Sequence, residues 1–294
     1  MRKLLTTVFG LILLSGCAYL GAAHYDKLFG EEQPRERFVA ASTLEGAEFL
    51  NDVKPVLDTR CVVCHGCYDA PCQLKLSSVE GIDRGLSKER VYDGTRLLAQ
   101  EPSRLLFDAT TTAQWREKGF TPVLNERIQT AEANLTGSVL YNALVLKQSS
   151  PLPKQAILGD EFDFSLDREQ TCTTMSEFDS FAKDNPHSGM PYGLPGISTE
   201  EFQHLAKWLR KGGYLAHIDP PEKDVLKQVE RWEAFLNQDG LKHQLAARYI
   251  YEHWYLAHIY FPEHGDKHSY FKLVRSSTPP GEEIKHISTR RPYE

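Results

Sequence analysis

Two cysteines and a histidine stand within five residues, in the run Cys61-Val62-Val63-Cys64-His65. Each thiol of such a pair can add to one vinyl group of a haem, and the adjacent imidazole then lies under the iron. We therefore expect one covalently attached haem c, held by Cys61 and Cys64, with His65 as the proximal iron ligand.

A redox dithiol and a zinc site are the alternatives for the same two thiols. A thioredoxin-like dithiol follows a hydrophobic strand, whereas the apolar residues ahead of Cys61 recur at helical spacing. Zinc needs a second pair of ligands, and the only nearby thiols are Cys67 and Cys72. Both alternatives are therefore less favoured than haem.

A second candidate ligand lies in the loop Gly189–Gly196, which is rich in proline and glycine. Ser198 and Glu201 have the spacing of a capping box, which predicts that a helix follows directly. A methionine in a loop before a C-terminal helix resembles the distal-ligand segment of cytochrome c domains. We expect Met190 to bind the iron from the distal side. His187 is the competing ligand, and for it we expect a solvent-exposed loop imidazole instead.

The amino terminus has the pattern of an export signal, because two cations precede an uncharged stretch over residues 4–23. Leu14-Ser15-Gly16-Cys17 resembles a bacterial lipobox, in which Cys17 is acylated. The other two outcomes are cleavage after Ala23 and an uncleaved membrane span. All three place the folded part outside the cytoplasm, so we expect a periplasmic, membrane-tethered protein.

Three cysteines remain, namely Cys67, Cys72 and Cys172. In an oxidising compartment Cys67 and Cys72 can form a disulfide, and either of them can pair with Cys172 instead. The sequence leaves this pairing open. The formal net charge of −6 gives no electrostatic case for nucleic acid as a partner.

The fold class predicted is mainly α, a cytochrome c-like haem domain with additional helices and little sheet, since no run alternates with period two. The helix over about 241–260 is apolar or aromatic nearly all round, which predicts burial, with a lipid-facing surface as the alternative. We expect its three histidines to be ordinary packed or surface residues. The other expected helices include 44–58, 87–100 and 132–147, one opened by Thr174, and one near 222–238.

Four regions follow from this reading. Residues 1–23 form the signal or anchor segment and residues 24–43 a polar tether. Residues 44–216 form the haem domain with an insertion. Residues 217–294 are a helical region, the start of a further domain that continues beyond the chain.

The chain resembles the fatty acid cis-trans isomerases of Gram-negative bacteria over most of its length from about residue 44. The most specific motif runs from Cys61 through His65-Gly66-Cys67-Tyr68-Asp69-Ala70-Pro71 to Cys72. Further motifs follow in family order: Glu89-Arg90-Val91-Tyr92, Trp115-Arg116-Glu117-Lys118-Gly119-Phe120, Gly189–Gly196, Ser276-Ser277-Thr278-Pro279-Pro280-Gly281 and Thr289-Arg290-Arg291-Pro292-Tyr293.

This resemblance implies a periplasmic haem enzyme that converts cis double bonds in membrane phospholipid acyl chains to trans, which lowers membrane fluidity under stress. Family members extend past the end of this chain, so it corresponds to their amino-terminal part, and many lack a lipobox. The residues by themselves fit two other functions equally well. One is a periplasmic c-type cytochrome that carries electrons, and the other is a redox or stress sensor without turnover.

Overall fold

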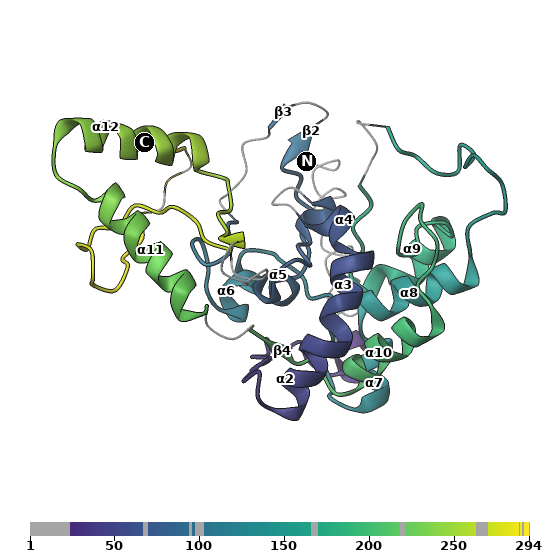
Figure 1. The fold of residues 1–294 in the computed structure, drawn as a ribbon. Coiled ribbons are helices and arrows are strands. Elements are labelled where there is room, and N and C mark those ends of the chain that lie inside the picture. Colours follow the sequence, from purple (N-terminus) through teal and green to yellow (C-terminus); the bar gives the residue numbers. More distant parts are fainter. Residues whose placement is uncertain are drawn as a thin grey trace, which may run out of the picture. The chain divides into compact units, whose positions relative to one another are not determined.

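The computed structural model describes residues 24–66, 70–93, 96–97, 103–165, 170–217, 221–262, 270–287, 289 and 291–293. Within these residues the protein is mainly helical with short strands, as the sequence predicts (Figure 1). The chain forms two compact units. Unit 1 comprises Met1–Gln100 and Thr110–Ala216, and unit 2 comprises Glu101–Ala109 and His217–Glu294. The assignment of a haem domain to residues 44–216 stays a prediction.

From residue 44 onward, unit 1 contains helical segments that follow one another directly, as Figure 1 shows in dark blue. The Thr43 side chain accepts a hydrogen bond from the Gly46 amide and caps the first of them. The prediction of a helix over 44–58 is confirmed, and this helical run leads into the Cys61–His65 motif. The segments are α2 (Leu44–Glu48), the π-helical η1 (Phe49–Val53), α3 (Lys54–Arg60) and α4 (Val62–His65).

The predicted helix over 87–100 is wrong, because two antiparallel strands lie there, β2 (Tyr92–Asp93) and β3 (Arg96–Leu97). Tyr92 pairs with Leu97 and Asp93 with Arg96, and this pairing between strands is not visible in helical spacing. The other elements of this part of unit 1 are η2 (Pro71–Gln73), α5 (Val79–Arg84), α6 (Thr112–Glu117), α7 (Ala131–Thr136) and α8 (Val139–Ser149).

The core of unit 1 forms around α10 (Thr199–Arg210), which packs against η1, α7 and α8. The capping box of Ser198 and Glu201 is present, as the sequence predicts. The rings of Phe49 and Trp208 lie 5.9 Å apart and join η1 to α10. Before α10 come η3 (Met175–Glu177) and α9 (Phe178–Asp184).

Two short parallel strands, β1 (Phe38–Val39) and β4 (Leu215–Ala216), join the start of unit 1 to its end. The buried Arg37 reinforces this connection, because its guanidinium donates to the carbonyls of Gly212 and Asn125. A buried guanidinium is stable only when its N–H groups find acceptors, and these two carbonyls supply them.

Unit 2 contains α11 (Lys223–Leu236) and α12 (Leu241–Trp254), which pack against each other through Trp232 and Trp254. The expected burial of α12 is wrong: none of its residues is buried, and Leu241 and Leu245 are 85% and 69% exposed. The helix packs against α11, and Arg275 lies over the ring of Tyr251, but these contacts leave every residue of α12 at least partly exposed. No helix in the described residues has the length and apolar character needed to cross a membrane.

Candidate functional site

The turn from α3 into α4 places Cys61, Cys64 and His65 together. The His65 amide donates to the Cys61 carbonyl at 2.9 Å, and the Cys64 amide approaches the same oxygen at 3.2 Å. Both cysteines are free thiols, Cys61 half-buried and Cys64 exposed. On a helix, residues three apart share a face, so the backbone presents two thiols on one side of α4.

His65 is buried, and its ring is held by one hydrogen bond, from Nδ1 to the Leu74 carbonyl oxygen at 3.0 Å. A carbonyl oxygen only accepts, so Nδ1 carries the proton and Nε2 keeps its lone pair. Burial lowers the pKa of His65, which keeps the imidazole neutral. This is the arrangement of an imidazole metal ligand, whose second nitrogen donates to a carbonyl and thereby fixes the ring. Two free thiols beside such an imidazole form a donor set that fits a covalently attached haem.

Burial is the main cause that raises the pKa of the Cys61 thiol to about 12, and the neighbouring Cys64 adds to it. Cys61 is therefore protonated and is not an attacking thiolate of a redox dithiol. The described residues hold no group of three or more His, Cys, Asp or Glu side chains placed to bind a metal ion. Cys67 lies outside those residues.

The loop that carries Met190 is docked on α8. The Met190 amide donates to the Ala143 carbonyl at 3.0 Å. A Cβ at Gly189 would lie 2.3 Å from the Lys147 amide nitrogen, so only glycine permits this close approach. Met190 is half-buried. It lies on a different segment from His65, and its role as distal ligand stays a prediction.

His187 is half-buried, contrary to the exposed loop imidazole that we expect from the sequence. Its ring packs against Phe162 at 5.5 Å, which sequence spacing does not reveal. Its Nδ1 is buried, and no hydrogen-bond partner for it is found among the residues that the structure describes. His187 therefore remains the competing candidate for a distal ligand.

One disulfide connects Cys72 to Cys172, with a Cα–Cα distance of 5.6 Å across 100 residues of chain. It selects one of the pairings that the sequence leaves open. The remaining cysteines, Cys17 and Cys67, lie outside the described residues, so lipidation of Cys17 stays a prediction.

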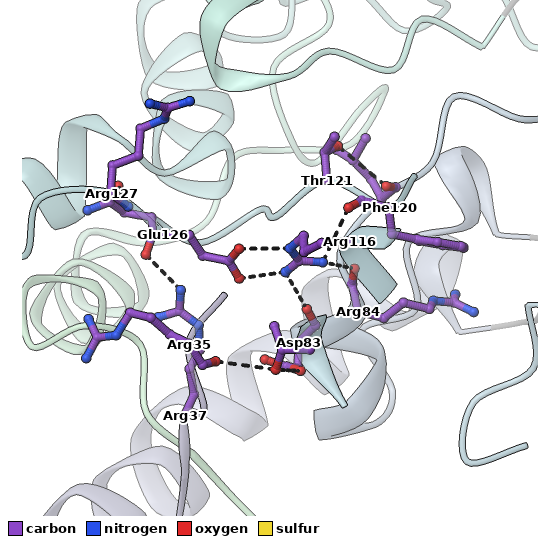
Figure 2. A network of polar contacts seen from close by, with 12 residues as sticks. Arg35, Arg37, Asp83, Arg84, Arg116, Phe120, Thr121, Glu126 and Arg127 are labelled. Atoms are coloured by element: carbon purple, nitrogen blue, oxygen red, sulfur yellow. Dashed lines mark hydrogen bonds and ion pairs between the residues drawn. The ribbon is translucent and has the colours of Figure 1, made fainter. Parts of the chain in front are cut away.

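Sequence reasoning missed a network of buried polar groups beside α5, which Figure 2 shows. Arg116 binds both carboxylate oxygens of the buried Glu126, at 2.8 and 2.6 Å. It also donates to the carbonyls of Asp83 and Arg84 at 3.0 and 2.8 Å, at the C-terminal end of α5. The sequence could have pointed to this network through the motif Trp115–Phe120, which resembles the isomerase family and contains Arg116. The motif alone assigns no role to Arg116.

Asp83 contributes a second buried carboxylate to this network. Its Oδ2 accepts a hydrogen bond from the Thr112 hydroxyl at 2.7 Å, while Oδ1 is buried without a hydrogen bond. Burial raises the pKa of Asp83 to about 6, against the opposing effects of Thr112 and Arg116. These contacts tie α5 to α6 and to the segment around residue 126, so the network holds unit 1 together.

A model of the fatty acid cis/trans isomerase (CTI) family matches residues 100–294. The chain belongs to this family, which confirms the resemblance seen in the sequence. The match contains Arg116, Cys172 and Met190 and begins after the Cys61–His65 motif, so the role of that motif stays a prediction. Searches of curated proteins and of solved structures gave no match.

Proposed function

We propose that the protein is a haem-dependent isomerase that converts cis double bonds in membrane phospholipid acyl chains to trans and thereby lowers membrane fluidity under stress. The family match over residues 100–294 carries the isomerase part of this proposal. The hydrogen bond from His65 Nδ1 to the Leu74 carbonyl carries the haem part, since it leaves Nε2 available to bind iron.

Isomerisation needs rotation about a carbon–carbon double bond, which is prohibitively slow until the π character of the bond is reduced. A haem bound at this site would supply an electron-withdrawing centre, which is the chemistry needed to reduce the π character of the bond. Substrate and product have the same composition, so no external reductant or nucleotide is consumed.

The chain supplies the positions of the groups. In the proposal Cys61 and Cys64 anchor the haem c covalently at α4, and His65 binds the iron through Nε2. Met190 would supply its thioether sulfur as a second iron ligand. Such a ligand would raise the reduction potential of the iron, which suits electron withdrawal from an alkene.

We place the enzyme in the periplasm, tethered to the membrane through the segment over residues 1–23. A catalyst held at a membrane surface searches for acyl chains in two dimensions instead of three. The rival function is a c-type electron carrier. It predicts haem attachment as well, but no formation of trans double bonds.

The deciding experiment is gas chromatography of membrane fatty acids after solvent stress in cells that produce the protein. We expect trans fatty acids with the wild type and with Val63→Ala, a control in which both thiols remain. We expect none with the double variant Cys61→Ala, Cys64→Ala. Equal trans content in the double variant and the wild type contradicts haem dependence. Haem attachment without any trans product favours the electron carrier.

The distal ligand is tested by absorption spectroscopy of the haem-loaded protein. Met190→Ala should shift the spectrum from low spin to high spin, because it removes the sixth ligand. An unchanged low-spin spectrum that is lost in His187→Ala transfers the assignment to His187.

A further inference from the structure

We propose that Arg84 and the Cys72–Cys172 disulfide are positioning groups for His65, acting through the backbone segment Cys72–Leu74. The proposal deepens the proposed function, since it rests on His65 as the iron ligand. Neither group touches the imidazole. Both groups hold the backbone segment whose Leu74 carbonyl fixes the orientation of the His65 ring.

The imidazole depends on this segment directly. His65 Nδ1 donates to the Leu74 carbonyl at 3.0 Å, and the Leu76 amide donates back to the His65 carbonyl at 2.7 Å. No other hydrogen bond to the His65 ring is found in the described residues. A shift of the Leu74 carbonyl therefore frees the ring to rotate and to exchange its proton between Nδ1 and Nε2.

The segment has a backbone conformation that does not persist without support. Cys72 and Gln73 have φ angles of 57° and 51°, in the left-handed region that is unfavourable for residues with a Cβ. Two such residues in succession are stable only when surrounding contacts hold them. The position of the next residue, Leu74, depends on those contacts.

Arg84 supplies one of these contacts from the end of α5. Its guanidinium donates to the Gln73 carbonyl, in the peptide that directly precedes Leu74. The side chain is 1% exposed and stacks near the rings of Trp115 and Phe120, at 5.5 and 4.8 Å.

The backbone of Arg84 is fixed as well, because Arg116 of the buried network donates to its carbonyl. Figure 2 shows the Arg84 side chain leaving this network on the side away from Arg116. The buried network thus supports the segment that orients His65.

The disulfide supplies the second contact, at the first residue of the segment. Cys72 is bonded to Cys172 of a distant part of the chain. Its amide donates to the Gln170 side chain at 3.1 Å, and its carbonyl accepts from the Ser87 amide at 2.8 Å. Cys72 is therefore held at its side chain and at both backbone polar groups.

The test is ¹⁵N NMR of histidine-labelled protein, exported to an oxidising compartment in cells without haem-attachment machinery. The His65 signals are assigned by their loss in His65→Gln. In the wild type we expect one tautomer, protonated at Nδ1. The variant Arg84→Lys keeps the positive charge but replaces the planar guanidinium, with its several N–H donors, by an ammonium group. In this variant the Nδ1 and Nε2 signals of His65 should move toward each other, because both tautomers become populated.

Arg37→Lys is the matched control, because Arg37 is equally buried and also donates to carbonyls, but outside this segment. Its His65 signals should stay as in the wild type. If Arg84→Lys does not fold, the double variant Cys72→Ser, Cys172→Ser removes the disulfide instead, and the His65 tautomer is measured in the same way. A single Nδ1-protonated tautomer in the variant that folds overturns the proposal, and so does an equal change in Arg37→Lys.

The haem-loaded protein gives an independent readout. The reduction potential of the iron should shift in Arg84→Lys and stay unchanged in Arg37→Lys, because the imidazole orientation and its hydrogen bond tune the metal. Equal potentials in Arg84→Lys and the wild type count against the proposal. Failure of the wild type to attach haem counts against the proposed function instead, while the NMR result in haem-free protein still decides the positioning.

Discussion

Units 1 and 2 use similar helices in different ways. In unit 1, α10 is amphipathic and buries Leu205, Trp208 and Leu209 against its neighbours. In unit 2, α11 is equally amphipathic and buries only Val225. Apolar side chains at helical spacing therefore predict a helix and the face it offers, but not whether that face is covered.

The ion pairs of the two units are buried to different depths. Unit 1 buries the Arg116–Glu126 pair, whose carboxylate side chain is fully inaccessible. Unit 2 has a mostly buried pair as well, Arg104–Asp108, and keeps Asp224–Lys227 exposed and Arg248–Glu252 partly exposed. A buried pair that loses one partner leaves an uncompensated charge, whereas water screens an exposed pair. Buried pairs should accordingly be far more sensitive to substitution than exposed pairs.

The largest expected effect is from Glu126→Gln. The substitution removes the carboxylate and leaves the Arg116 guanidinium without its counter-charge, so the free energy of unfolding should fall by about 3–5 kcal/mol. Urea unfolding measures it. Glu252→Gln, at the partly exposed Arg248–Glu252 pair, should leave the unfolding curve nearly unchanged. Equal sensitivity of the two pairs would remove the distinction between buried and exposed pairs.

Truncation of a core leucine is the next largest effect. Leu205→Ala in α10 should lower the free energy of unfolding by about 2–5 kcal/mol, because Leu205 is fully buried and leaves a cavity. The matched variant Leu245→Ala in α12 should change it by no more than about 0.5 kcal/mol, since Leu245 is exposed. A large loss in Leu245→Ala would mean that α12 is covered in solution.

The stability of unit 1 should depend on pH through Asp83. The folded protein keeps the Asp83 proton up to about pH 6, whereas the unfolded chain loses it near pH 4. The folded state therefore binds more protons in this range, and the Asp83 contribution to the free energy of unfolding falls as pH rises from about 4 to 6. A shift of about two pKa units corresponds to about 2–3 kcal/mol.

Asp83→Asn isolates this contribution from that of other carboxylates, because the amide oxygen can still accept the hydrogen bond from Thr112. The difference in unfolding free energy between wild type and variant should change between pH 4 and 6 and be constant above pH 7. Parallel curves across the whole range would show that Asp83 titrates normally.

The smallest effect expected in unit 1 is the loss of a helix cap. Ser198→Ala removes the side-chain acceptor of the Glu201 amide at the start of α10 and should cost about 1 kcal/mol. Thermal unfolding followed by circular dichroism measures it. A Ser198→Gly variant should lose only a few tenths of a kcal/mol, since glycine is tolerated at this position.

Short sequence patterns predicted the parts of the fold that depend on residues close together in the chain. The capping box of α10, the helical run before Cys61 and the scarcity of sheet all follow from spacing within a few residues. The prediction of a helix over 87–100 was wrong because β2 and β3 pair with each other, and helical spacing does not exclude such pairing. The exposure of α12 depends on which elements cover it, and no sequence period reports that.

The candidate site divides in the same way. Cys61, Cys64 and His65 are adjacent in the chain, so their chemistry can be read from the sequence. The Leu74 carbonyl that orients His65, the buried Arg84 and the Cys72–Cys172 bond depend on tertiary contacts. Only the folded backbone brings these groups together.

Covalent haem attachment at α4 is tested most directly by extraction of the protein after maturation in the periplasm. The protein is denatured and treated with acidic organic solvent, and haem is then measured in both fractions. Our proposal predicts one haem per chain that stays with the polypeptide, and none in the double variant Cys61→Ala, Cys64→Ala. Haem that passes into the solvent, or that stays bound to the double variant, would contradict it.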